Sequence, residues 1–175
     1  MVQPPDGPVP DYLRVGGIDH VGITVRSLER SLAFYRDLLG LRVIEISGGD
    51  EDVGQIVGIP GARIRAADLD AGDGRIFELI EYVTAGDDAV PQRPNGPGCP
   101  HVALRVRDIA QVLQRLAAAG HNPIGKVTTI TGAIAWEGAT LVYLRDPDGA
   151  LIELIQRPAA TTWIGYRGSA PTESA

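Results

Sequence analysis

Cysteine, clustered positive charge and long apolar runs are what this sequence has least of. The single cysteine, Cys99, excludes an intrachain disulfide and a metal site built from CxxC pairs. No apolar run approaches the roughly 18 residues of a membrane span, which argues against a membrane protein. A net charge of −6 without a Lys/Arg cluster argues against a nucleic-acid partner. Any metal bound here must therefore have histidine and carboxylate ligands.

The sequence begins without the basic and then apolar segment of a signal peptide, so we expect a cytoplasmic protein. Its 44% hydrophobic and 22% charged residues are ordinary for a soluble globular chain. A chain of 175 residues can fold as one compact unit, or as two small units that share a core.

A turn–strand pattern near the C-terminus also occurs earlier in the chain. Residues 148–155 (DGALIELI) form a tight turn and a short apolar strand with Glu153 at its centre. Residues 73–80 (DGRIFELI) have the same pattern with Glu78 at the centre. An ionised glutamate inside such a strand must face water, pair with a cation or bind a metal, because burying it unpaired is very costly.

The similarity continues upstream of each glutamate. Residues 17–28 (GIDHVGITVRSL) match residues 98–109 (GCPHVALRVRDI), and the aligned histidines are His20 and His101. Each copy therefore has one histidine on its first strand and one glutamate on its last. An internal repeat of this kind indicates two copies of one fold unit.

Composition divides the chain into five segments. Residues 1–14 are rich in proline and are expected to form a loose arm, and residues 86–97 are a proline- and glycine-rich linker. The first unit then covers residues 15–85 and the second covers residues 98–158. Residues 159–175 are polar and small, which is typical of a C-terminal tail.

Both units are predicted to have the order strand, helix, then three strands. The first is expected to hold strands at 18–25, 41–46, 62–69 and 76–83, a helix at 28–39 capped by Ser27, and an acidic loop at 47–52, with residues 53–57 unassigned. The second is expected to hold strands at 101–106, 122–129, 139–144 and 151–156, and a helix at 109–119 capped by Asp108.

The four repeated residues His20, Glu78, His101 and Glu153 are candidate ligands of one divalent metal ion. Two carboxylates would neutralise the ion, and imidazole favours transition metals over Ca²⁺ or Mg²⁺. Four protein ligands around an octahedral ion leave two positions for a bidentate oxygen substrate. The alternative for each residue alone is a hydrogen-bonded structural histidine or a solvated surface glutamate.

These motifs resemble the vicinal oxygen chelate superfamily, which contains glyoxalase I, methylmalonyl-CoA epimerase, extradiol dioxygenases and fosfomycin-resistance enzymes. The resemblance covers roughly residues 16 to 158 and is carried by residues 18–25 (IDHVGITV), 34–41 (FYRDLLGL), 101–104 (HVAL) and 143–149 (YLRDPDG), followed by Glu153. It implies an α+β fold of two tandem βαβββ modules, whose mixed sheets form a cup around a metal site.

Within the superfamily, the set of metal ligands differs between reaction types. Extradiol dioxygenases use two His and one Glu around Fe(II), whereas the further candidate Glu78 matches the extra ligand position of glyoxalase I and the epimerases. The pattern implies a metal-dependent isomerase or lyase that transfers a proton through an enediolate or enolate of a small oxygenated metabolite. Glu153 is the first choice as catalytic base and Glu78 the second. The ion is expected to be Ni, Co, Mn or Zn.

Two alternatives stay open, namely a ring-cleaving dioxygenase with Fe as its metal and a metal-free protein that binds a ligand or sequesters an antibiotic. The substrate is not predicted, because the arginines are scattered along strands and turns. Open sheets leave edges that relatives cover by pairing, so a homodimer is expected. Whether the two modules pair within one chain or are exchanged between chains is undecided.

Other polar and aromatic residues have weaker signals. Glu51 in the acidic loop is placed like an acidic residue of the epimerases, although a solvated charge is the simpler interpretation. Glu81 should point away from Glu78 and lie on the surface. His121 has no counterpart in the first unit and is expected to be exposed. Trp136 and Glu137 could form a lid over a substrate or simply lie on the surface.

Overall fold

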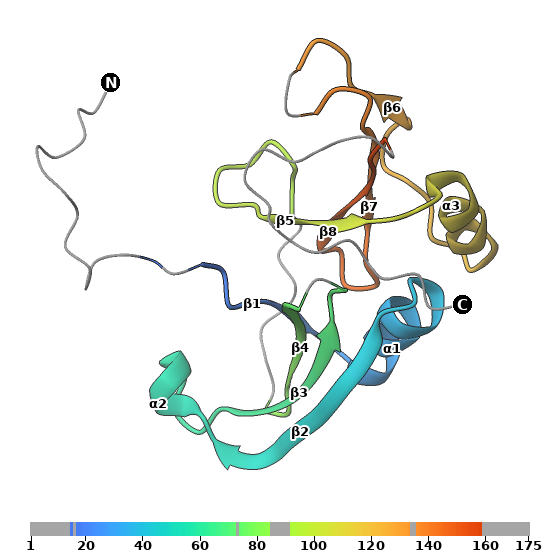
Figure 1. The fold of residues 1–175 in the computed structure, drawn as a ribbon. Coiled ribbons are helices and arrows are strands. Elements are labelled where there is room, and N and C mark those ends of the chain that lie inside the picture. Colours follow the sequence, from blue (N-terminus) through green and yellow to red (C-terminus); the bar gives the residue numbers. More distant parts are fainter. Residues whose placement is uncertain (1–14, 16, 73, 85–91, 134–135, 159–175) are drawn as a thin grey trace, which may run out of the picture.

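The computed structural model describes residues 15, 17–72, 74–84, 92–133 and 136–158. The predicted arm and tail, and much of the predicted linker, lie outside these residues. The fold consists of two modules, each built on a four-stranded sheet (Figure 1). No helix in the described ranges is long and apolar enough to cross a membrane.

The first module has the strand order β1-β4-β3-β2, with β1 parallel to β4 and the other pairs antiparallel. Its strands are β1 (His20–Val25), β2 (Arg42–Asp52), β3 (Arg63–Asp70) and β4 (Ile76–Tyr82), and its helices are α1 (Leu28–Leu32), the π-helix η2 (Ala33–Leu38) and α2 (Gly54–Val57). The helix predicted for 28–39 is therefore present, but its second half is wound as a π-helix. The cap is confirmed, because the Ser27 side chain accepts a hydrogen bond from the backbone of Arg30.

The second module repeats this topology in the order β5-β8-β7-β6, with β5 parallel to β8. Its elements are β5 (His101–Arg105), α3 (Ile109–Ala118), β6 (Thr128–Thr129), β7 (Thr140–Arg145) and β8 (Leu151–Gln156). Asp108 caps α3 as predicted by accepting a hydrogen bond from the backbone of Gln111. The α+β fold of two βαβββ modules is confirmed.

Two predicted segments were wrong. The expected acidic loop at 47–52 is the second half of β2, in which Ser47 pairs with Ala66 and Asp52 with Arg63. Gly48 and Gly49 have positive φ, so they form an irregularity within the strand instead of a turn. The strand expected at 122–129 is reduced to the two residues of β6, since proline and glycine interrupt the segment before it.

One hydrophobic core joins the two modules and lies on a defined side of each sheet. Side chains alternate along a strand, and the buried residues of β4 and β8 flank the two glutamates. The core residues that matter for the site are Phe34 and Tyr35 of η2, Phe77 and Leu79 of β4, and Ile152 and Leu154 of β8. Glu78 and Glu153 therefore lie on the sheet faces that point away from this shared core.

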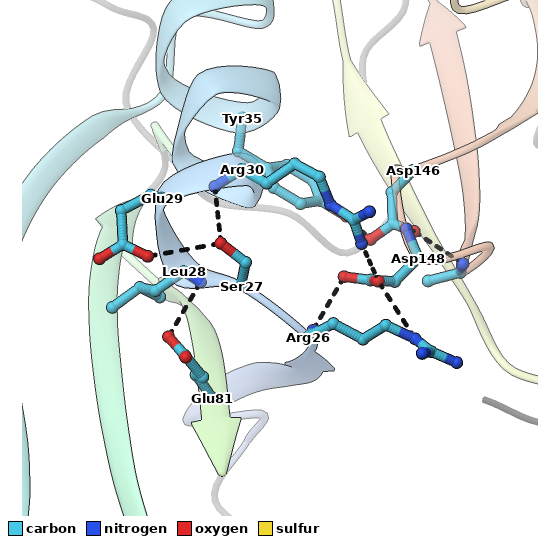
Figure 2. A network of polar contacts seen from close by, with 10 residues as sticks. Arg26, Ser27, Leu28, Glu29, Arg30, Tyr35, Glu81, Asp146 and Asp148 are labelled. Carbon is cyan, nitrogen blue, oxygen red and sulfur yellow. Dashed lines mark hydrogen bonds and ion pairs between the residues drawn. The ribbon is translucent and has the colours of Figure 1, made fainter. Parts of the chain in front are cut away.

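Polar contacts also connect the modules, between the N-terminal helix and the turn before β8 (Figure 2). The Tyr35 hydroxyl donates a 3.0 Å hydrogen bond to Asp146 Oδ2, and both side chains are buried. Asp148 accepts a hydrogen bond from the backbone N–H of Arg26 and pairs with the guanidinium of Arg30. These contacts hold the beginning of β8 against the first module.

Candidate metal centre

The first histidine–glutamate pair lies where β1 runs beside β4. Glu78 is in register with Gly22, and His20 lies two residues earlier on the same face of β1. The His20 Nε2 atom is 3.7 Å from Glu78 Oε2. The other ring nitrogen, Nδ1, is 2.8 Å from Asp19 Oδ1. A carboxylate at Nδ1 fixes the orientation of the ring and leaves Nε2 to act as a ligand.

Charge around His20 supports the imidazolium form when no metal is bound. The hydrogen bond to Asp19 is the main cause that raises the pKa of His20, and the charge of Glu78 raises it further. Asp68 contributes in the same direction from β3, where it is in register with Glu78. Asp68 was not singled out from the sequence, although alternation along its strand places it opposite the buried Leu69 and Ala67.

The absence of a side chain at Gly22 leaves space beside the Glu78 carboxylate. A Cβ atom at Gly22 would lie 3.3 Å from Glu78 Oε2 and 3.3 Å from the end of the Ile80 side chain. Ala103 has the equivalent register position in the second module, opposite Glu153. The first half of the site is therefore more open beside its glutamate than the second half.

The second pair is tighter and less exposed. His101 Nε2 is 3.2 Å from Glu153 Oε2, and the Glu153 side chain is 7% exposed, compared with 22% for Glu78. The Tyr143 ring contacts the His101 ring edge-on at 5.2 Å. Burial and the contact of its hydroxyl with Glu153 raise the pKa of Tyr143 to about 12, so this phenol stays protonated and can donate to the carboxylate.

The two pairs do not meet within one chain. Among the described residues, no three His, Cys, Asp or Glu side chains lie close enough together to hold a metal ion. The physical reason is the shared core, which lies behind both sheets and leaves each pair on an outward face. The structure thus shows two half-sites of one imidazole and one carboxylate each, and the cup enclosing all four residues stays a prediction.

The donor set of each half-site fits a divalent transition metal. Imidazole nitrogen and carboxylate oxygen are suitable ligands, and both histidines present Nε2 toward their glutamate. Protein sites for such ions use three or four protein ligands, so one half alone is incomplete. The residues present therefore fit a metal only if the two halves are combined.

An open cavity of about 1360 Å³ lies between the modules. Its lining includes residues 21–26, residues 96–102 and the turn 148–151. Of the four predicted ligands, all of which the structure describes, only His101 lines it. This cavity follows the junction of the modules, and Gly22, the register partner of Glu78, is among its lining residues.

The weaker candidates have roles that the sequence did not predict. Glu81 does point away from Glu78, but it accepts a hydrogen bond from the backbone of Leu28 at the start of α1, so a surface role was wrong. His121 is only partly exposed and contacts the ring of Phe34 at 4.8 Å. The signal for both is tertiary, because their partners lie more than 50 residues away.

Two further candidates are placed differently. The side chain of Glu51 lies outside what the structure describes, so its role is untested. Trp136 is partly exposed and its ring contacts Arg157, while the Glu137 carboxylate accepts a 2.6 Å hydrogen bond from the backbone of Gly132. Both residues thus help to order the loop that precedes β7.

Comparisons with known proteins agree with this architecture. Residues 17–154 match the model of the glyoxalase/bleomycin resistance protein/dioxygenase superfamily. A lactoylglutathione lyase of Haemophilus influenzae is 27% identical over 146 residues, which are 83% of this chain and 96% of that protein.

Solved structures are similar in fold. A glyoxalase family protein of Bacillus cereus has a TM-score of 0.71 at 24% identity, and the match covers 85% of this chain and 98% of that one. A fosfomycin resistance protein of Listeria monocytogenes, solved with Mn(II) and sulfate, has a TM-score of 0.55 at 18% identity, with 83% and 96% covered.

Proposed function

Because the chain belongs to the glyoxalase/bleomycin resistance protein/dioxygenase superfamily, we propose that it is a divalent-metal-dependent lyase or isomerase acting on a small oxygenated metabolite. The observation that carries this proposal is the buried Glu153 carboxylate, 3.2 Å from His101 Nε2. Its counterpart, the pair of His20 and Glu78, supplies the same chemistry from the other module. A protein that only sequesters a ligand has no need of two such pairs.

The metal is proposed to be held by His20, Glu78, His101 and Glu153. When bound, an ion such as Ni²⁺, Co²⁺, Mn²⁺ or Zn²⁺ supplies Lewis acidity toward two neighbouring oxygens of a substrate. The Asp19 carboxylate orients His20 for this role, and the edge-on contact with Tyr143 orients His101.

Glu153 is proposed to take the proton from the substrate carbon and to return it. Its surroundings suit that task, because the carboxylate is buried, which keeps bulk water from taking the place of the substrate beside it. The protonated Tyr143 hydroxyl keeps the carboxylate in position without competing for the proton. Glu78, on the other half of the site, is the second carboxylate that can exchange a proton.

The complete site is proposed to form between two copies of the chain. Each copy would contribute His20 and Glu78 to one site, and His101 and Glu153 to the other. Two observations support a site shared between chains. Both half-sites lie on faces that point away from the shared core, and each half-site has only one histidine and one glutamate as possible ligands. Closed twofold dimers are the commonest way in which such faces are covered.

The substitution Glu153→Gln tests the proposed chemistry. It should lower turnover by about 10²–10⁴-fold while keeping part of the metal affinity, because the amide oxygen can still coordinate but cannot accept the proton. Lactoylglutathione is the first substrate to use, because the relatives are named for it. The measurement is deuterium uptake from D₂O at the carbon next to the thioester carbonyl.

Two comparisons sharpen this test. Glu78→Gln should lose less than Glu153→Gln if the proton moves on one face of the substrate, and about as much if both faces are used. Glu45→Gln, the same change on an exposed strand residue of β2, should have no effect. Full turnover by Glu153→Gln, or oxygen-dependent ring cleavage by the wild type, would show that the proposal is wrong.

A further inference from the structure

The open cavity between the modules lies beside two outer strand edges. In the described part of the chain, β1 has only β4 as a neighbouring strand, and β5 has only β8. The cavity lining includes residues 21–26 and residues 96–102, which contain most of β1 and the beginning of β5. Successive side chains of a strand point to opposite faces, so a run of consecutive lining residues indicates that the backbone edge of β1 faces the cavity.

The cavity also contains apolar side chains that the described residues cover only in part. Val21, Ile23 and Val102 are partly buried, and Ile59 is 51% exposed, although all four line the cavity. A strand edge next to such side chains is a surface to which another extended segment can bind. Hydrogen bonds of the main chain would then contribute affinity, and the side chains of the added segment would cover the apolar wall.

Two terminal segments of this chain lie outside the described residues, namely residues 1–14 and 159–175. Residues 1–14 contain four prolines, which lack the N–H group that strand pairing requires. Residues 161–166 (TTWIGY) contain β-branched and aromatic residues and no proline, which is typical of strands. The sequence therefore favours the C-terminal segment as the one that pairs with a strand edge.

The C-terminal segment also begins close enough to reach the cavity. β8 starts at Leu151, which lines the cavity, and the described chain ends at Pro158. A segment that turns back beside β8 needs about seven residues, or about 23 Å, to return to the level of Leu151. Gly165 would then lie at that level, and the next residues would approach Cys99, which lines the cavity two residues before His101.

We propose that residues 161–166 bind in this cavity as an additional strand along the outer edge of β1. Ile164 and Tyr166 then lie on one face of the added strand and Trp163 on the other, so both walls of the cavity gain apolar contacts. His101 lines the same cavity, so the bound segment covers this side of the half-site. The binding requires neither a metal ion nor proton transfer.

The single cysteine provides a direct test, because Cys99 lines the cavity. Gly168→Cys introduces a second thiol just beyond the proposed strand, and Ser174→Cys introduces one six residues further along the same segment. Each full-length variant is oxidised at micromolar concentration, and the disulfide with Cys99 is followed over time by mass spectrometry. A disulfide needs Cβ atoms about 4 Å apart, so its rate of formation measures how often the two thiols meet.

Gly168→Cys should form the intramolecular disulfide at least about 10-fold faster than Ser174→Cys, because the bound segment keeps its thiol near Cys99 at a high effective concentration. An unbound segment would give similar rates, since loop closure depends only weakly on loop length. Adding Trp163→Ala to Gly168→Cys should remove most of the difference between the rates. All three changes lie outside the described strands, so the two modules should still fold.

Trp163 fluorescence gives a second, independent measurement. The sequence has two tryptophans, so Trp136→Phe leaves Trp163 as the only reporter. Its emission should be blue-shifted and should resist quenching by acrylamide. Ile59→Lys places a charge in the cavity wall and should reverse both effects. Ile44→Lys makes the same change on a residue of β2 that is also 51% exposed, but outside the cavity lining, and it should leave the emission unchanged.

Three outcomes would overturn the inference. The first is a similar disulfide rate for Gly168→Cys and Ser174→Cys, and the second is a Trp163 emission typical of a fully exposed indole. The third is a disulfide that forms only between chains, which would assign the cavity to a second copy of the protein. None of these measurements depends on metal or turnover, so they are independent of the test with Glu153→Gln.

Discussion

At the scale of single residues, the contact between Tyr35 and Asp146 joins the two modules through a buried hydrogen bond. Asp146 accepts hydrogen bonds from the Tyr35 hydroxyl and from the backbone N–H groups of Asp148 and Ala150, at 3.0, 2.9 and 2.8 Å. Burial nevertheless raises the pKa of Asp146, and the hydrogen bonds offset only part of this effect. The folded chain therefore holds a proton on Asp146 more strongly than the unfolded chain does.

The raised pKa of Asp146 determines how the unfolding free energy changes with pH. An acid whose folded pKa is raised contributes most to stability below its usual pKa, and this contribution is lost as the pH rises through the folded pKa. Tyr35→Phe removes a donor to the carboxylate, raises the pKa of Asp146 further and should lower the unfolding free energy by about 1–3 kcal/mol at pH 7. The loss should be smaller near pH 4, where Asp146 is more often protonated.

Urea unfolding of wild type and Tyr35→Phe at the two pH values measures this difference. Tyr82→Phe removes the same hydroxyl from a partly exposed residue at the end of β4, and it should change stability little at either pH. Equal destabilisation by Tyr35→Phe at both pH values would contradict the assignment to the Asp146 charge.

At the scale of elements, helix α1 depends on a strand for its first turn. The helix has only five residues, and its first backbone N–H groups lack partners within the helix. Ser27 accepts from Arg30, as the sequence indicated, while Glu81 of β4 accepts from Leu28 at 3.0 Å and from Arg65 at 3.3 Å. A carboxylate at this position also interacts favourably with the helix dipole.

Glu81→Ala should lower the unfolding free energy by about 1–3 kcal/mol, because it leaves the partly buried N–H of Leu28 without an acceptor. Glu81→Gln keeps an acceptor oxygen and should lose less. The midpoint of urea unfolding measures both changes. Ser27→Ala removes the other capping hydrogen bond, and its expected cost of about 1 kcal/mol in unfolding free energy is the reference for comparison. If Glu81→Ala unfolds at the same midpoint as wild type, the proposed cap has no energetic role.

At the scale of the whole molecule, the two half-sites on outward faces lead to the expectation of a dimer. Light scattering at micromolar concentration should give about twice the chain mass of 18.5 kDa. A single species at the chain mass would contradict the prediction. A dimer whose metal content is one ion per chain would further support a site made from all four ligands.

Mixed dimers distinguish a shared site from one within a chain. One chain carries His20→Ala and Glu78→Gln, and the other carries His101→Ala and Glu153→Gln. If sites form between chains, the mixed dimer keeps one intact site and should bind one metal ion, whereas either mutant homodimer should bind little. If sites form within a chain, the mixed dimer has no intact site. Metal analysis of the purified mixed dimer gives the answer without an activity assay.

The sequence alone determined the features that depend on short-range pattern. The alternation of apolar residues predicted most strands, and the caps Ser27 and Asp108 predicted both helix starts, because these signals act over a few residues. The internal repeat predicted two modules. It also placed one histidine on the first strand and one glutamate on the last strand of each module.

Only the tertiary structure decided how distant segments meet. It extended β2 through the expected loop and joined Tyr35 to Asp146. It also showed that the shared core lies behind both sheets, so the two half-sites face outward. The physical reason is that these arrangements depend on which surfaces pack against each other across the modules, and local spacing in the sequence carries no information about that packing.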